Sequence, residues 1–138
     1  AVSRGVGKIV VELRDLPPKG HWQDFPCCVT AATDSAIKNY PRILEKFVLL
    51  ISKTNSWCNK NRIEAATITA EWIGLPPETA KSSSLNYLPK FTKNWMKNAN
   101  EYMTVLNRMN KFKGLLKNKT LEETRSILLD TQFIDKVR

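Results

Sequence analysis

Residues 26–32 read Pro-Cys-Cys-Val-Thr-Ala-Ala, and this apolar run predicts a β-strand placed centrally in a sheet. Residues 7–13 form a second apolar run and predict another strand. Between them, residues 15–20 hold two prolines and a glycine, which favour a turn and a loop. We therefore expect two or three strands in residues 1–33, the start of a helix-rich α/β fold.

Helical periodicity replaces this pattern after residue 33 and predicts about six helices over residues 34–138. Asp34 is the expected N-cap of a short helix, and Pro41 suits the first turn of a long one. A helix over residues 62–73 is expected to end at Gly74, because glycine adopts the left-handed conformation that stops a helix.

The second half of the chain continues in the same way. Pro77 is expected to begin a helix that runs to about Ser83. Thr92 can cap the longest periodic segment, whose apolar positions extend as far as Phe112 and which Gly114 closes. Thr120 and Glu123 have the spacing of a capping box, and residues 133–137 are expected to form a last short helix.

Positive charge is concentrated in one segment. The chain has 138 residues, one domain's worth, and a net charge of +9. Residues 81–119 hold nine basic side chains and one acid, Glu101. Such a block is found on nucleic-acid-binding and membrane-binding surfaces, but the regular spacing of these bases favours a solvated helix face. No apolar run is long enough to span a membrane, and we expect any export signal to lie upstream of Ala1.

The cysteines give no clear chemical motif. Cys27 and Cys28 are adjacent, a geometry that strains a disulfide between them, and we expect both to be buried as small apolar side chains. Cys58 can reach one of them in an oxidising compartment. A thiol and base pair of Cys27 with His21 is a weaker alternative, because a nucleophilic cysteine needs an electropositive, partly exposed setting.

We predict no catalytic residue, no metal site and no cofactor. The capping box explains the paired carboxylates Glu122 and Glu123, and no glycine-rich phosphate loop is present. His21 is the only histidine and lacks a partner at zinc-ligand spacing. Trp22 is the one tryptophan whose place in a loop suggests contact with a ligand.

Several short motifs, taken in their order and spacing, resemble one known family. They are Asp24-Phe25-Pro26-Cys27-Cys28-Val29, Asn39-Tyr40-Pro41, Glu71-Trp72-Ile73-Gly74-Leu75-Pro76 and Phe112-Lys113-Gly114. Across residues 5–137 the chain is similar to the C-terminal part of solute-binding proteins of ABC importers. The branch is the one for nitrate, alkanesulfonates, taurine and thiamine-pyrimidine precursors.

The resemblance implies the C-terminal part of a type II periplasmic-binding fold, in which two lobes close on a small solute and present it to a membrane permease. Residues 1–33 would then supply strands and the crossing between lobes, and residues 34–138 the closing helices of the first lobe. The resemblance places Asp24, Phe25, Pro26 and Cys27 nearest the cleft. It also implies an extracytoplasmic protein that is not an enzyme.

Two strands do not make a stable sheet alone, so we expect a fragment of a larger binding protein or a chain that completes its sheet with a partner. Two other functions stay open. One is a thiamine-pyrimidine synthase relative of the same fold, and the other is a basic helical module that binds nucleic acid. The main hypothesis includes no nucleic-acid partner.

Overall fold

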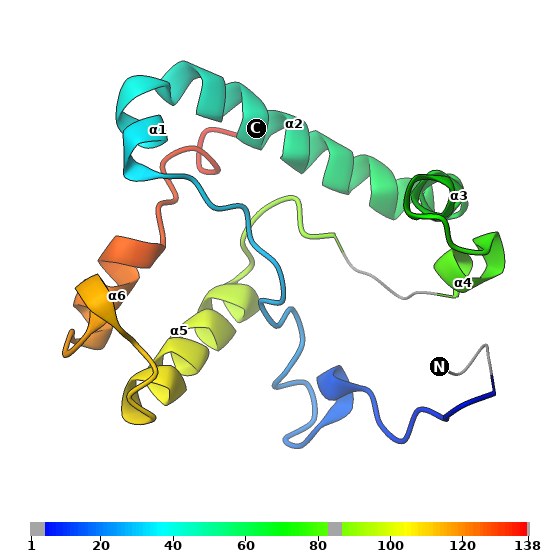
Figure 1. Cartoon of the computed structure of the whole chain (residues 1–138), viewed down its shortest axis with the longest axis horizontal. Coiled ribbons are helices and arrows are strands. Elements are labelled where there is room, and N and C mark those ends of the chain that lie inside the picture. Colours follow the sequence, from blue (N-terminus) through cyan, green and yellow to red (C-terminus); the bar gives the residue numbers. More distant parts are fainter. Residues whose placement is uncertain (1–4, 83–86, 138) are drawn as a thin grey trace.

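The computed structural model describes residues 5–82 and 87–137, and these residues fold into helices joined by long irregular segments (Figure 1). The α-helices are α1 (Asp34–Asn39), α2 (Pro41–Lys60), α3 (Arg62–Ile73), α4 (Pro77–Lys81), α5 (Lys93–Arg108) and α6 (Leu121–Leu128). Two short 3-10 turns, η2 (Leu13–Asp15) and η3 (Gly114–Leu116), complete the order.

The predicted α/β fold is wrong, because the described residues contain no β-strand. Residues 7–12 and 25–33 are neither helical nor paired in a ladder, and Val10 and Val29 are 90% and 65% exposed. A strand needs a second segment to accept and donate its backbone hydrogen bonds, and these two segments do not supply one another. The type II architecture expected from the resemblance therefore fails together with the sheet.

Helices α1 to α4 follow one another as an elongated arm (Figure 1). Thr33, one residue before the predicted Asp34, caps α1 by accepting a hydrogen bond from Ala36 N at 3.1 Å. Pro41 opens α2 as predicted. Gly74 ends α3 with a φ of 68°, and the Leu75 N–H donates to Ala70 O at 2.9 Å. The predicted end of α4, Ser83, lies outside the described residues.

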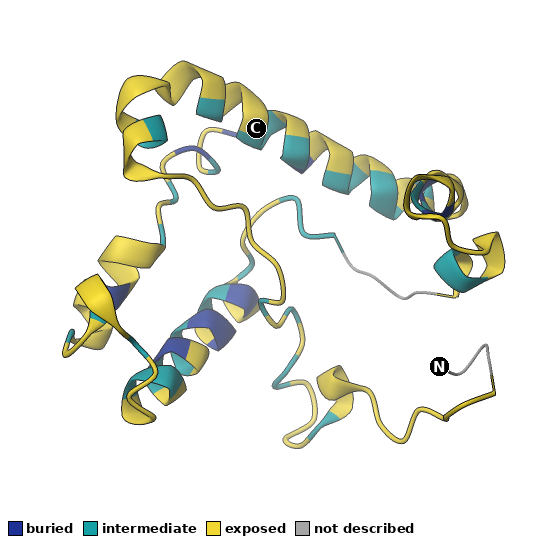
Figure 2. Ribbon diagram, in the orientation of Figure 1, coloured by how far each residue is buried: buried dark blue, intermediate teal, exposed yellow. Residues whose placement is uncertain are grey.

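Among the described helices, α5 holds the largest number of buried residues (Figure 2). The buried side chains lie on one face, at positions three, four and eight residues apart, where helical residues align: Trp95, Asn98, Ala99 and Met103. Thr92 caps the helix as predicted, by accepting from Trp95 N at 2.9 Å. The helix stops at Arg108, before the predicted Phe112, because Asn110 takes a left-handed φ of 51°, a conformation that asparagine tolerates.

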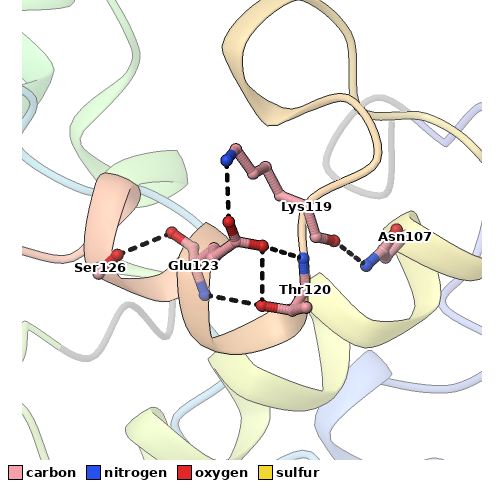
Figure 3. A network of polar contacts seen from close by, with 5 residues as sticks. All are labelled: Asn107, Lys119, Thr120, Glu123 and Ser126. Carbon is pink, nitrogen blue, oxygen red and sulfur yellow. Dashed lines mark hydrogen bonds and ion pairs between the residues drawn. The ribbon is translucent and has the colours of Figure 1, made fainter.

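Helix α6 is anchored to α5 through its own N-terminus (Figure 3). The predicted capping box is confirmed: the Thr120 hydroxyl accepts from Glu123 N at 3.2 Å, and Glu123 Oε2 accepts from Thr120 N at 2.8 Å. Asn107 of α5 donates through its Nδ2 to Lys119 O at 2.9 Å. The cap and this bond together fix where α6 begins.

The end of the chain returns to α2 (Figure 1). Residues 132–136 form hydrogen-bonded turns, so the predicted last helix at residues 133–137 is wrong. Phe133 and Val137 are nevertheless buried, and Lys136 Nζ lies 3.3 Å from Glu45 Oε2 of α2. Phe133 and Val137 are thus buried as the apolar pattern indicates, although their backbone forms turns and not a helix.

Candidate functional site

Residues 21–25 dock onto α5 through three polar contacts. His21 Nε2 lies 2.7 Å from Glu101 Oε2, and Asn98 Nδ2 donates to Gln23 O at 2.7 Å. Asp24 Oδ2 accepts from the Thr92 hydroxyl at 2.8 Å, with Asp24 itself at a φ of 56°. The segment is therefore held to the helix at its start, middle and end.

Aromatic rings add an edge-to-face chain along the same docking surface. Ring centroids are 4.6 Å apart for His21 and Trp22, 5.6 Å for Trp22 and Phe25, and 5.6 Å for Phe25 and Tyr102 of α5. Trp22 Nε1 also donates to Pro17 O at 3.3 Å. Asp24 and Phe25 thus contact α5 and its N-cap, whereas Trp22 reaches the helix only indirectly, through its contact with Phe25.

Pro26 and Cys27 continue away from this contact. Pro26 is half-buried, whereas Cys27 and Cys28 are both exposed and neither is in a disulfide. The expectation that the cysteine pair is buried is wrong, because the sheet that was to cover it does not form. His21 pairs with Glu101 and not with Cys27, so the structure does not bring the suggested thiol and base together.

An open groove of about 490 Å³ lies between α2 and residues 88–92. Its walls carry three lysines and two aromatic rings, Lys53, Lys60, Lys90, Trp57 and Phe91. No ion pair joins these ammonium groups to a carboxylate of the described residues. The volume falls within the roughly 300–1,000 Å³ range of small-molecule sites.

Two asparagines of α2 hold the far wall of the groove in place. Asn55 Nδ2 donates to Leu88 O at 2.9 Å. Asn59, one helical turn later, donates through Nδ2 to Tyr87 O and accepts from Tyr87 N. Because these amides satisfy backbone groups of an irregular segment, they fix Lys90 and Phe91 opposite α2.

The groove is continuous with the docking surface through Thr92. This residue lines the groove, caps α5 and donates its hydroxyl proton to Asp24. The sequence analysis missed the groove because it assigned no role to Lys53 and Lys60 and interpreted the bases of residues 81–119, which include Lys90, as a solvated helix face. The spacing of Asn55 and Asn59, four residues apart on one helix face, was the available signal that a segment binds there.

Metal-ligating side chains do not gather in residues 5–82 and 87–137: no group of three histidine, cysteine, aspartate or glutamate residues lies close enough to hold an ion. Among the helices that the structure describes, none combines the length and apolar character needed to cross a bilayer.

Comparison with known proteins gives a family for the N-terminal half. The sequence model of the NMT1-like family matches residues 1–74, which supports part of the resemblance to the nitrate, sulfonate and thiamine-precursor binding proteins. Neither a curated protein nor a solved structure matches.

The resemblance of residues 75–137 stays a prediction. The family suggests a solute-binding or related protein. Since the match covers more than half of the chain, the protein belongs to the NMT1-like family.

Proposed function

We propose that this protein is part of the solute-binding component of an ABC importer and captures a small solute of the sulfonate, nitrate or pyrimidine type. The observation that carries the proposal is the lysine groove, an anion-attracting and partly aromatic site in a chain of the NMT1-like family. The protein would bind and release the solute outside the cytoplasm, without covalent chemistry and without a cofactor.

The arrangement of α2 supports an anionic solute. Lys53, Trp57 and Lys60 are separated by four and three residues, spacings that place them on one helix face. Each ammonium group carries three donors, and sulfonate and nitrate oxygens are acceptors. The Trp57 ring between the two lysines offers an apolar surface for the organic part of a sulfonate or for a pyrimidine ring.

Lys90 adds the third charge from the opposite wall. Its neighbour Phe91 stacks on Trp95, with ring centroids 4.2 Å apart and planes at 12°, so this wall is tied to the buried face of α5. Closure of a second protein surface over the open groove would exclude water and strengthen the charge interactions, so the solute would bind the closed state more tightly.

We further propose that the remainder of the same protein supplies that second surface and that a membrane permease receives the solute. The exposed apolar side chains of residues 6–13 support a partner surface, since Val6, Val10 and Leu13 are 76%, 90% and 77% exposed. Large apolar side chains that gather on an exposed surface are characteristic of contacts with another protein segment.

A thermal-shift assay on the full-length protein tests the proposed function, with taurine, nitrate and a methylated aminopyrimidine as probes. A ligand that binds only the native state stabilises it by about 2.7 kcal/mol at a concentration one hundred times its Kd. We expect one probe to raise the apparent Tm. Lys53→Gln, Lys60→Gln and Lys90→Gln should each reduce that rise.

Lys46→Gln is the matched control, because Lys46 is an exposed lysine of the same helix outside the groove. An equal loss in Lys46→Gln and in the groove variants would contradict the groove as the site. Failure of all three probes would contradict the solute class. Stabilisation by a single-stranded oligonucleotide that disappears steeply with added salt would favour the nucleic-acid alternative.

A further inference from the structure

Cys27 and Cys28 present two thiols side by side on the surface. Their sulfur atoms are 3.8 Å apart, with the Cys28 thiol donating to Cys27 Sγ. Both residues are exposed, so neither thiol is used in packing. The docking of residues 21–25 and the proposed solute groove leave this pair without a role.

The backbone around the pair is not part of a helix or a strand. Residues 26–32 have no regular secondary structure, and their backbone makes no hydrogen bond with another part of the described chain. Gln23 and Asp24, which lie one residue before this segment, are bonded to Asn98 and Thr92. The thiol pair therefore lies near the start of a segment without backbone pairing, and the residues just before this segment are bonded to α5 and its N-cap.

We propose that Cys27 and Cys28 together form a two-thiolate site for a soft, thiophilic metal or metalloid centre, the class of cuprous ion and singly substituted trivalent arsenic. Thiolate sulfur is the ligand that such soft centres select. Two adjacent sulfurs bind one centre as a chelate, so the second bond forms at a high effective concentration.

The reaction with an organic arsenic oxide balances without an oxidant or a reductant. Each thiol loses its proton and forms one sulfur–arsenic bond, and the arsenic–oxygen bond breaks. The oxygen leaves as water with the two protons, and arsenic stays trivalent. With cuprous ion, two protons are released to solvent and two sulfur–copper bonds form.

The hydrogen bond between the thiols keeps the two sulfur atoms close enough to bind one centre. The side-chain hydrogen bond to Cys27, followed by the charge interaction with Cys27, raises the pKa of Cys28. The thiolate is the form of cysteine that binds the centre, so both thiols lose their protons as the chelate forms.

Phenylarsine oxide tests the site on the reduced full-length chain. The protein is treated with one equivalent, dialysed against 2-mercaptoethanol, and weighed as an intact mass. A monothiol competes poorly with a chelate, so we expect one phenylarsenic group to stay bound. Binding to Cys27→Ser and to Cys28→Ser should be weaker by about 100-fold or more, the gain expected from two linked contacts.

Cys58→Ser is the matched control, since Cys58 is a partly buried free thiol of α2, and it should retain the group like the parent chain. Cuprous ion under competition with a chromogenic chelator forms the second arm and distinguishes the metal from the metalloid. Retention that needs both Cys27 and Cys28 in either arm supports the proposal. Retention that survives a single substitution, or none in both arms, overturns it.

Discussion

Helix α5 and the irregular segment at residues 7–12 both carry large apolar side chains, but only the helix buries them. Trp95 and Met103 of α5 are 5% and 6% exposed, whereas Val10 is 90% exposed. Composition alone therefore does not decide burial. The two regions differ in where their backbone hydrogen bonds are made.

A helix makes its backbone hydrogen bonds within itself, so α5 needs only a surface to cover its apolar face. An extended segment must find a second segment for the same purpose. Residues 21–25 lie between these extremes. They are not helical or paired, yet they reach α5 because side chains, Asn98 and Thr92, bond to Gln23 and Asp24.

Replacing Trp95 by alanine is the strongest way to test this contrast. Trp95 is buried and stacks on Phe91, so Trp95→Ala should lower the free energy of unfolding by about 3–5 kcal/mol. Val10→Ala removes an apolar side chain that is almost fully exposed, and should change it by no more than about 0.5 kcal/mol. Urea unfolding of both variants measures the difference. Similar losses would mean that residues 7–12 are buried in solution.

Asn98 tests how the docked segment is held. Asn98→Ala removes the donor to Gln23 O, and we expect a loss of about 1 kcal/mol. Amide hydrogen exchange of the peptide over residues 21–25 should become faster while exchange in α2 is unchanged. Asn94→Ala, at an exposed position of the same helix, is the control. Equal exchange in the two variants would contradict a role for Asn98 in docking.

The sequence predicted those elements whose signals are local. Pro41, Gly74, Thr92 and the capping box at Thr120 each act within one turn of their own helix, and each was placed correctly. The strands were wrong because their formation depends on a pairing segment that no local signal reports. Residues 133–137 are buried but adopt turns, so their apolar pattern indicated burial and not the type of structure.

In the candidate site, too, the sequence signals were local, and contacts between distant residues could not be predicted. Trp22 was predicted as a ligand contact from its place in a loop, and Asp24 and Phe25 from the family resemblance. The structure shows Asp24 and Phe25 in contact with α5 and its N-cap, with Trp22 packed on Phe25, and their contact with a ligand stays a prediction. Contacts across 68 or 75 residues, to Thr92 and Asn98, had no sequence signal. The spacing of Asn55 and Asn59 could indicate that some segment binds α2, but it could not identify that segment, since Lys90 meets Lys53 and Lys60 only after the chain has folded.

Acidification gives the smallest expected effect and separates local capping from packing. Glu123 accepts from Lys119 Nζ at 2.8 Å and from the Thr120 amide and hydroxyl (Figure 3). The Lys119 bond, followed by the Thr120 bonds, lowers the pKa of Glu123 from 4.5 to about 2. Its contribution to stability is therefore fully present above pH 4.5 and is lost as the pH falls through about 2.

We expect this contribution to be small and sensitive to salt, because the carboxylate is exposed to solvent. An NMR titration of the Glu123 carboxyl group should show a midpoint well below 4.5, and Lys119→Gln should raise it, since Lys119 supplies the largest cause of the shift. Lys117→Gln, which removes an exposed lysine two residues away, should leave the midpoint in place. Equal midpoints in both variants would mean that the charge of the whole segment, and not the capping geometry, lowers the pKa.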